Sequence, residues 1–334
     1  MRNNVNTSVK ITVAIPTYNS TATIRSTLES VLAQTVKPDE ILVLDDGSSD
    51  ETCPILESYA PRVTLFRQEN QGVAGARNAL CARAGGDLIA FLDHDDIWHP
   101  SYLEVQRHFF IEYPDAAAFF TAHVNFNGYD SYEWNGAAAM NRLPAAELLA
   151  PLDFLRRYNE TTGPFGSMSY CCVPKRVLAE IGSEPFRLSG VDDSYLCTQL
   201  PLLGRPVVFA SLPLVAYRIT REAQSTNKLK AFAQWVEIFR ILEPRYQNLG
   251  DRELRDAFEN AFASKRRNYA KLLMGAGEKS KARQQLRESM SNSRDPISRS
   301  KSLALLTLTH MPPALQPRWP SSYRQQVAET RNDQ

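Results

Sequence analysis

The sequence lacks the features that mark membrane-spanning, secreted and metal-thiolate proteins. It contains no run of eighteen or more apolar residues, so nothing predicts a transmembrane helix. Its first ten residues hold no apolar core of a secretory signal. The cysteines are few and show no paired C-x-x-C spacing, which disfavours a zinc or dithiol redox site. They are Cys53, Cys81, Cys171, Cys172 and Cys197. These absences predict a protein of the reducing cytoplasm.

An excess of charge of one sign is also missing. Lys and Arg number 38 against 37 Asp and Glu, which leaves a formal net charge of +1. Surfaces that bind nucleic acid concentrate positive charge, so we expect no nucleic-acid partner. The apolar content of 43% is ordinary for a globular chain. The length suits one large domain or two ordinary ones.

Short apolar runs alternate with helical periods through the first half of the chain. We expect strands at 11–15, 41–44, 63–66 and 88–92. We expect helices at 21–34, at 72–84 and, capped by Ser48 or Ser49, up to residue 59. Pro16 is expected to end the first strand. This alternation predicts an α/β fold with a mostly parallel sheet covered on both faces, whose ligands bind at the carboxyl ends of the strands.

The pattern changes from about residue 116. We expect a strand at 118–122, a helix at 148–158, a glycine-bearing loop at 163–167 before an apolar strand near Tyr170, and two strand-like pieces within 206–217. Beyond Arg221 only helices are predicted, at 229–242, 252–274 and 279–291. The apolar run 303–308, which follows Arg299 and Lys301, is expected either to rest on a membrane surface or to pack against these helices.

An acidic cluster directly follows the strand predicted at 88–92. Asp93, Asp95 and Asp96 surround His94, and like charges this close raise one another's pKa values. Carboxylate oxygens beside a histidine suit Mg²⁺ or Mn²⁺. The alternative is an ordinary turn in which Asp96 caps the next helix.

Polar residues also follow the first two strands. Tyr18, in the segment 16–19, either stacks on a base or belongs to a simple turn. In the segment 45–50, a carboxylate can accept the N–H of a uracil-like base, and Gly47 permits a close backbone approach. The alternative reading of 45–50 is a cap for the following helix.

Two later positions complete the set of candidate residues. Gly72 and Arg77 open a helix, without the spacing of a Walker loop or a dinucleotide fingerprint, and Arg77 either reaches the acids and the ligand or is a solvated charge. Asp192 and Asp193 fall in the first turn of a predicted helix, where the dipole stabilises carboxylates by roughly 0.3–1 kcal/mol. Capping needs only one acid, so the pair suggests a general base.

In this order the motifs resemble the family 2 glycosyltransferases, which have the GT-A fold. The matching segments are 13–19, 41–50, 70–72, 76–78, 86–87, 91–96 and Pro100. The resemblance implies a GT-A catalytic domain over residues 1–220, with a nucleotide-sugar-binding half at 9–115 and an acceptor-binding half at 116–220. A helical C-terminal extension at 221–320 and a disordered tail at 321–334 would follow.

The resemblance implies an inverting transfer of a sugar from a nucleoside diphosphate sugar, with UDP favoured, to an acceptor hydroxyl. The acceptor would be a glycan, a lipid-linked saccharide or another hydroxyl compound of cell-surface polysaccharide or glycoconjugate synthesis. Such an enzyme could contact the inner face of the membrane peripherally. A divalent metal, Mn²⁺ or Mg²⁺, is the implied cofactor.

The resemblance also implies roles for single residues. Asp46 would bind the base, Asp95 the metal directly with Asp93 in support, and Arg77 would lie near the phosphates. Asp193 would be the catalytic base, with Asp192 as the alternative because the family's usual Glu-Asp pair is Asp-Asp here; Gln199 stands where the family often has arginine. The nucleotide-sugar pocket would be lined by Pro16, Thr17, Tyr18, Asn19, Asp46, Gly72, Arg77, Asp93 and His94.

Acceptor specificity is expected within residues 125–166, whose aromatic residues either stack on sugar rings or pack locally. They are Tyr129, Tyr132, Trp134 and Phe165. A sugar nucleotidyltransferase is an alternative, but it would carry a glycine-rich basic loop where segment 16–19 stands. A non-catalytic sugar-binding protein is the other alternative, and the acids at 46, 95 and 193 disfavour it.

Overall fold

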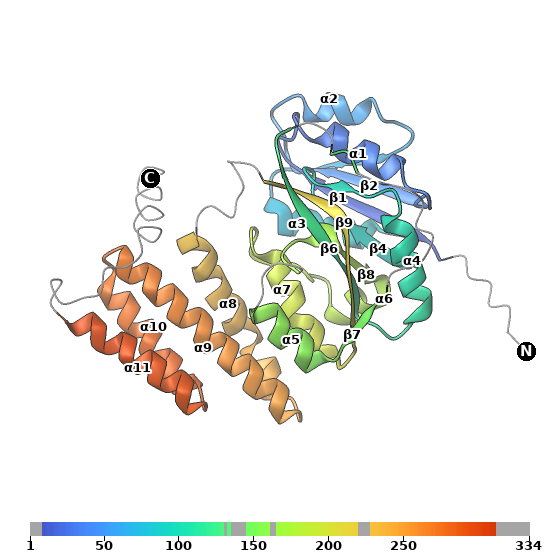
Figure 1. Cartoon of the computed structure of the whole chain (residues 1–334). Coiled ribbons are helices and arrows are strands. Elements are labelled where there is room, and N and C mark those ends of the chain that lie inside the picture. Colours follow the sequence, from blue (N-terminus) through green and yellow to red (C-terminus); the bar gives the residue numbers. More distant parts are fainter. Residues whose placement is uncertain (1–8, 130–131, 135–144, 161–164, 220–227, 312–334) are drawn as a thin grey trace, which may run out of the picture. The chain divides into compact units, whose positions relative to one another are not determined.

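The computed structural model describes residues 9–129, 132–134, 145–160, 165–219 and 228–311 (Figure 1). The chain divides into two compact units. The first comprises residues 1–154 and 160–221, and the second comprises 155–159 and 222–334. The tail expected at 321–334 and positions 163–164 of the expected loop lie outside the described residues.

Four parallel strands build one half of the sheet in the first unit (Figure 1). Strand β1 lies between β2 and β4, and β3 borders β2. The strands are β1 (Ile11–Thr17), β2 (Glu40–Asp45), β3 (Thr64–Arg67) and β4 (Leu88–Phe91), joined by the helices α1 (Ile24–Leu32), α2 (Thr52–Glu57) and α3 (Gly72–Arg83). The apolar runs in the sequence predicted all four strands; β1, β2 and β4 are almost entirely buried, as parallel strands usually are, whereas β3 at the sheet edge is half-buried or exposed.

Two local expectations in this half were wrong. Pro16 does not end β1, which continues to Thr17 in register with β2. The missing N–H of Pro16 is tolerated because it points away from β2, beyond Ala14, where the pairing with β4 stops. Neither Ser48 nor Ser49 caps α2. The helix begins at Thr52, whose N–H donates to the Asp50 carboxylate over 3.0 Å.

The other half of the sheet is mixed in direction. Strand β8 runs antiparallel between β4 and β6, and β9 runs parallel to β6, so the order is β3-β2-β1-β4-β8-β6-β9-β5 with β7 also paired to β9. These strands are β5 (Ile97–Trp98), β6 (Ala118–Asn127), β7 (Glu147–Leu149), β8 (Cys171–Pro174) and β9 (Val207–Ile219). The predicted α/β class with a largely parallel central sheet is confirmed.

Three expectations in this half need correction. The two pieces predicted within 206–217 are the single strand β9, which stays continuous because irregularities in its pairing with β6 absorb Pro213. The helix predicted from residue 148 begins at Pro151, since residues 147–149 form β7. Phe165 is no sugar platform, because it is fully buried against Phe120 and Phe154.

The remaining helices of the first unit are short. They are α4 (Tyr102–Glu112), α5 (Pro151–Glu160), the 3-10 turn η1 (Met168–Tyr170), α6 (Lys175–Ile181), α7 (Asp192–Gln199) and the 3-10 turn η2 (Leu200–Leu203). Helix α5 is shared between the two units. Helix α7 carries Asp192 and Asp193 in its first turn, as its sequence predicted.

The second unit contains four helices among its described residues. They are α8 (Lys228–Gln247), α9 (Arg252–Gly275), α10 (Lys279–Asn292) and α11 (Pro296–His310). The apolar run 303–308 belongs to α11, where Leu305, Leu306 and Leu308 pack against a buried cluster of α9 and α10, while Leu303 is 52% exposed. Across the described part of the chain, no helix has the length and apolarity that crossing a membrane requires.

Candidate active site

The carboxyl ends of β1, β2 and β4 lie at one edge of the sheet. The chain moves from β1 outward to β2 and β3, then returns to the other side of β1 with β4. Such a reversal opens a crevice between the loops after the two central strands, and ligands of open α/β sheets bind there. The loops after β1 and β4 are residues 18–23 and 92–96, and they contain Tyr18, Asn19 and the acids that the sequence selected.

Asp46 is held at the end of β2 by a set of hydrogen bonds. Its backbone N–H donates to the Thr17 carbonyl over 2.8 Å, which joins the ends of β1 and β2. Its Oδ1 accepts from Gln68 Nε2 at 2.7 Å and from the Gln71 N–H at 3.0 Å. Gln68 was missed in the sequence, because nothing local marks a side chain that contacts a residue more than twenty positions earlier. Gln71 belongs to the matched segment 70–72 and contacts Asp46 through its backbone. The carboxylate is therefore fixed in orientation.

Tyr18 and Asn19 follow β1 on the surface. Tyr18 is 44% exposed. Asn19 adopts a positive φ of 47° and accepts the Ser49 N–H over 2.9 Å, a conformation that asparagine tolerates better than most residues. Tyr18 is thus an exposed residue next to Asn19, which contacts the segment that follows Asp46.

Gly72 makes a close approach between α3 and the loop that precedes α7. Its φ is +79°, and a Cβ at this position would lie 2.4 Å from Ser189 Oγ. Asn78, farther along α3, exchanges two hydrogen bonds with the backbone of Phe186, at 2.9 and 3.1 Å. Two contacts therefore tie the first turns of α3 to the segment that leads into α7.

Arg77 bridges two acids that lie far apart in the sequence. Its Nη1 donates to Asp192 Oδ2, and its Nη2 donates to Asp93 Oδ1. The side chain is 5% exposed and lies 5.7 Å from the Phe186 ring centre. Burial disfavours the charge, but Asp192 and Asp93 outweigh it and raise the arginine pKa. The sequence left open whether Arg77 is solvated, and the structure answers that it is buried and paired.

The acids after β4 differ in their surroundings. Asp93 Oδ2 accepts from Ser167 Oγ at 3.1 Å, so both of its oxygens are engaged. Among the described residues, no other residue donates a hydrogen bond to the Asp95 carboxylate. Burial raises the pKa of Asp95, with His94 opposing and Asp93 adding to the shift. Burial also raises the pKa of Asp96 well above its usual range, and Asp95 and Asp93 raise it further.

Asp96 is not a helix cap, contrary to one expectation. It is fully buried, and its Oδ1 accepts the Arg218 N–H at 2.9 Å, whereas α4 begins only at Tyr102. Arg218 also donates through Nε to the Asp95 carbonyl at 2.6 Å and lies 1% exposed. The end of β9 thus fixes the loop of residues 92–96, the acidic loop. Sequence reasoning missed Arg218 because its partners are more than 120 residues away.

Asp192 and Asp193 have different environments although they are adjacent. Asp192 receives Arg77 on Oδ2 and the Gly190 N–H on Oδ1 at 3.2 Å, and its side chain is 3% exposed. Asp193 is partly exposed, and its Oδ1 accepts the Ser194 N–H at 2.6 Å. Burial, followed by the neighbouring Asp192, raises the pKa of Asp193 to about 7. An aspartate of this kind can exchange a proton near neutral pH.

The acid cluster fits a divalent cation that is completed by a substrate. Within the described residues, no three His, Cys, Asp or Glu side chains are grouped to ligate a metal. Asp95 is nevertheless a half-buried carboxylate with a raised pKa, next to Asp93, and no other residue in the described part of the chain donates to it, which is the environment that a cation relieves. Magnesium characteristically binds through one or two carboxylates and takes its other ligands from phosphates and water.

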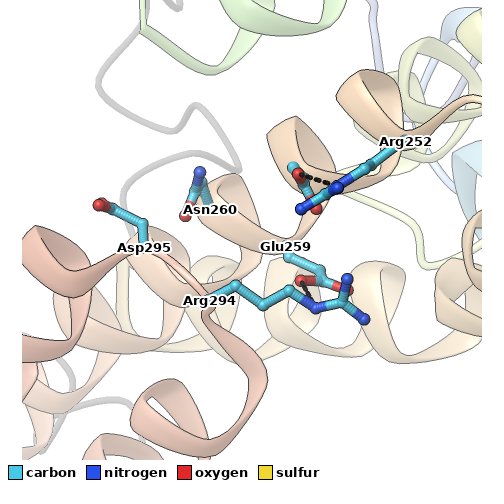
Figure 2. A pocket seen from close by; sticks show the side chains of 6 residues that line it. Arg252, Glu259, Asn260, Arg294 and Asp295 are labelled. Atoms are coloured by element: carbon cyan, nitrogen blue, oxygen red, sulfur yellow. Dashed lines mark ion pairs between the residues drawn. The ribbon is translucent and has the colours of Figure 1, made fainter.

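A separate pocket of about 240 Å³ lies in the helical unit (Figure 2). Four of its charged side chains form two ion pairs, Arg252 with Asp256 and Arg294 with Glu259, each over 3.7 Å, and the carboxylate of Asp295 accepts the N–H groups of Ile297 and Ser298. Charges that already neutralise each other leave little for a ligand. The candidate active site is therefore the acid-lined edge of the sheet.

Comparison with known proteins decides the family. The family model described as Glycosyl transferase family 2 matches residues 12–181, a range that covers β1 to β4 and the acidic loop. The chain belongs to glycosyl transferase family 2. This confirms the resemblance that its motifs carry, and the protein is a glycosyltransferase.

Relatives of this glycosyltransferase differ in how much of their length it covers. TuaG of Bacillus subtilis, named for teichuronic acid biosynthesis, is 30% identical over 239 residues, which are 70% of this chain and 88% of TuaG. WfgD of Escherichia coli, a UDP-Glc:α-D-GlcNAc-diphosphoundecaprenol β-1,3-glucosyltransferase, is 45% identical over 98 residues. Those residues are 29% of this chain and 39% of WfgD.

Solved structures share the fold of the glycosyltransferase. TarS of S. aureus, solved with UDP-GlcNAc, aligns with a TM-score of 0.65 at 18% identity over 97% of this chain and 92% of that one. The mannosyltransferase PcManGT of Pyrobaculum calidifontis, solved with GDP-Man and Mn²⁺, aligns with a TM-score of 0.59 at 19% identity over 96% of this chain and 83% of that one. The confirmed fold is therefore that of GT-A glycosyltransferases.

Proposed function

We propose that this glycosyltransferase moves a sugar from a UDP-sugar to an acceptor hydroxyl in cell-surface polysaccharide or glycoconjugate synthesis, with inversion at the anomeric carbon. The observation that carries the proposal is Arg77, which joins the acidic loop after β4 to the helix that bears Asp193. The names of TuaG and WfgD and the UDP-GlcNAc in the TarS crystal support the substrate classes.

The donor is proposed to bind across the ends of β1, β2 and β4. Asp46, oriented by Gln68 and Gln71, accepts the N–H of the base, and the exposed ring of Tyr18 covers it. This part of the pocket is completed by Pro16, Thr17, Asn19, Gly72 and His94. Asp95, with Asp93 beside it, would hold a divalent cation, which when bound supplies Lewis-acid stabilisation of the departing diphosphate. The Mn²⁺ in the PcManGT crystal supports that choice.

Asp193 is proposed to be the catalytic base, and Asp192 a positioning residue. Both oxygens of Asp192 are occupied, one by Arg77 and one by the Gly190 N–H, so this carboxylate has little freedom to take a proton. Asp193 is partly exposed, with a pKa near neutrality. It accepts the proton of the acceptor hydroxyl while the hydroxyl oxygen attacks the anomeric carbon from the face opposite the leaving diphosphate.

The test incubates the full chain with Mn²⁺, single UDP-sugars and a panel of acceptors that includes diphosphoundecaprenol-linked saccharides, and measures UDP release and product. Asp193→Asn is expected to lower turnover by about 10²–10⁴-fold and to leave UDP binding within twofold. Asp115→Asn, which changes an exposed aspartate, is the matched control. If the protein binds UDP but releases no UDP from any UDP-sugar, it is a non-catalytic binder. If turnover forms pyrophosphate instead of UDP, it is a nucleotidyltransferase.

A further inference from the structure

Three ring side chains from different segments meet beside the acids. His123 of β6 stacks on Tyr170 of η1, with ring centres 4.4 Å apart and an interplanar angle of 9°. Tyr217 of β9 stands edge-on to both rings, at 5.9 Å from each. His123 and Tyr217 are half-buried, whereas Tyr170 is 2% exposed. None of the three belongs to the motifs that identify the family.

The backbone places these rings on one face of the sheet. The pairing of β6 with β9 is irregular on both sides of Ala122, immediately before His123, and such irregularities re-aim side chains next to active sites. Beyond this irregular stretch, Asn125 of β6 pairs with Tyr217 of β9. Because side chains alternate along a strand, His123, Asn125 and Tyr217 lie on the same face of the sheet. Phe126 and Arg218 occupy the other face, where the guanidinium lies 4.5 Å from the ring centre.

The chain neighbours of both tyrosines hold the acidic loop. Ser169, directly before Tyr170, accepts the Asp93 N–H on its Oγ at 3.0 Å. Arg218, directly after Tyr217, contacts the Asp95 carbonyl and the Asp96 carboxylate. The ring cluster of His123, Tyr170 and Tyr217 is therefore anchored against the residues that are proposed to receive the diphosphate.

The chemistry of this ring cluster suits a sugar ring. Burial, and then Asp96, raises the pKa of both phenols, so each stays a neutral hydroxyl donor, and neither hydroxyl bonds to a described residue. Burial lowers the pKa of His123, opposed by a side-chain hydrogen bond with Asn125, and the neutral imidazole offers one donor and one acceptor nitrogen. Ring surfaces for C–H groups, together with the two phenol hydroxyls, suit the apolar and polar groups of a pyranose.

We propose that the ring cluster forms one wall of the subsite that binds the acceptor's pyranose ring and presents its hydroxyl to Asp193. This assignment rests on the proposed function. The cluster arises from β6, η1 and β9, in the half of the first unit beyond the acidic loop, whereas the donor's nucleotide is proposed to bind over β1 and β2. Asp93 donates its N–H to Ser169, which precedes Tyr170, and Arg77 joins Asp93 to Asp192, the neighbour of Asp193, so a short chain of contacts connects the cluster to the base.

The test compares Tyr217→Phe and His123→Ala with wild type by steady-state kinetics, with Tyr113→Phe as a control on α4's C-terminal end. Loss of one hydrogen bond costs about 0.5–1.5 kcal/mol, so Tyr217→Phe is expected to raise the acceptor KM by roughly 2- to 13-fold. The KM of the UDP-sugar and its hydrolysis without acceptor should stay within twofold. A rise in the donor KM alone would place the donor sugar on the cluster and overturn the assignment.

A second measurement does not depend on turnover. Saturation-transfer NMR with octyl glucoside, octyl galactoside and octyl N-acetylglucosaminide, in the presence of UDP and Mn²⁺, should show at least one pyranoside bound by wild type and lost in His123→Ala. If wild type transfers sugar but the variants keep wild-type acceptor KM and pyranoside binding, the ring-cluster proposal fails and the proposed function stands. If no donor supports turnover yet His123→Ala abolishes pyranoside binding, the proposed function fails and the subsite stands.

Discussion

Arg77 sets the charge balance of the active site. One buried guanidinium faces Asp192 and Asp93, which lie on different elements, and Asp193 adds a third negative charge nearby. A planar guanidinium can donate to two carboxylates at once, whereas a lysine ammonium is a single point charge. The residue therefore both neutralises two buried acids and fixes the helix that carries the proposed base.

Arg77→Lys is expected to reduce stability and turnover together. Breaking a buried ion pair typically costs 3–5 kcal/mol, and lysine preserves the charge, so we expect a loss of about 1–3 kcal/mol. Turnover should fall at least tenfold, because Asp193 loses its fixed position. Urea denaturation and steady-state kinetics measure the two effects, with Arg83→Lys, an exposed arginine on the same helix, as control. Wild-type stability in Arg77→Lys would show that the bridge is not needed.

Asp193 couples pH to both activity and stability. An unfolded aspartate ionises near pH 4, whereas the pKa of folded Asp193 is about 7. Between these values the folded state keeps a proton that the unfolded state has lost, so this residue lowers stability as pH rises from about 4 to about 7. As a base it must be ionised, so kcat/KM should rise with pH and level off above about 7.

Asp193→Asn separates these two roles of the carboxyl group. Asparagine cannot ionise, and its amide oxygen can still accept the Ser194 N–H. The variant should therefore have a higher Tm than wild type at pH 8, with a smaller difference at pH 5, while its turnover is lost. Differential scanning calorimetry at the two pH values measures this. Equal Tm values at pH 8 would contradict the raised pKa.

At the scale of single elements, the start of β4 depends on a close contact between two strands. Gly86, just before β4, donates its N–H to Thr12 Oγ1 over 2.9 Å. A Cβ at Gly86 would lie 2.7 Å from the Thr12 backbone nitrogen and 2.9 Å from the Lys10 carbonyl. Backbone atoms cannot move aside as a flexible side chain can, so β4 would have to shift away from β1.

Gly86→Ala is therefore expected to destabilise the first unit by about 1–3 kcal/mol. Gly250→Ala is the matched control, because nothing lies within 4 Å of its added methyl group. Urea denaturation midpoints compare the two variants. A Gly86→Ala midpoint equal to that of Gly250→Ala would mean that the strands accommodate the methyl group.

The sequence predicted elements well where burial leaves a local pattern. β1 to β4 appear as apolar runs, and α8, α9 and α10 appear as 3.6-residue periods, whereas α11 was recognised only as the apolar run 303–308. Strand β9 was predicted as two pieces because Ser211 and Pro213 interrupt its apolar run, and only the pairing with β6 shows that it is continuous. Contacts such as Arg77 with Asp192, 115 residues apart, leave no periodic signature, so their geometry needed the structure.

At the scale of the whole molecule, the division into two units predicts two cooperative unfolding events. Each unit has its own buried apolar residues: β1 to β4 in the first, and the cluster around Leu273 and Leu286 in the second. Units with separate cores commonly unfold separately. A ligand of the first unit then raises the temperature of only one transition, since stabilisation follows binding to the folded state of that unit.

Calorimetry of the full chain with and without UDP and Mn²⁺ tests this division. UDP at a hundredfold excess over Kd should stabilise one transition by about 2.7 kcal/mol and leave the other unchanged. Leu286→Ala truncates a fully buried side chain of the second unit. It should reduce the free energy of unfolding of that unit, whose transition UDP does not shift, by about 2–5 kcal/mol. Leu303→Ala, on a 52% exposed leucine of the same unit, should change it by less than about 0.5 kcal/mol. A single transition that responds to both UDP and Leu286→Ala would mean that the helices and the sheet unfold as one body, and that the helical unit contributes directly to the stability of the donor site.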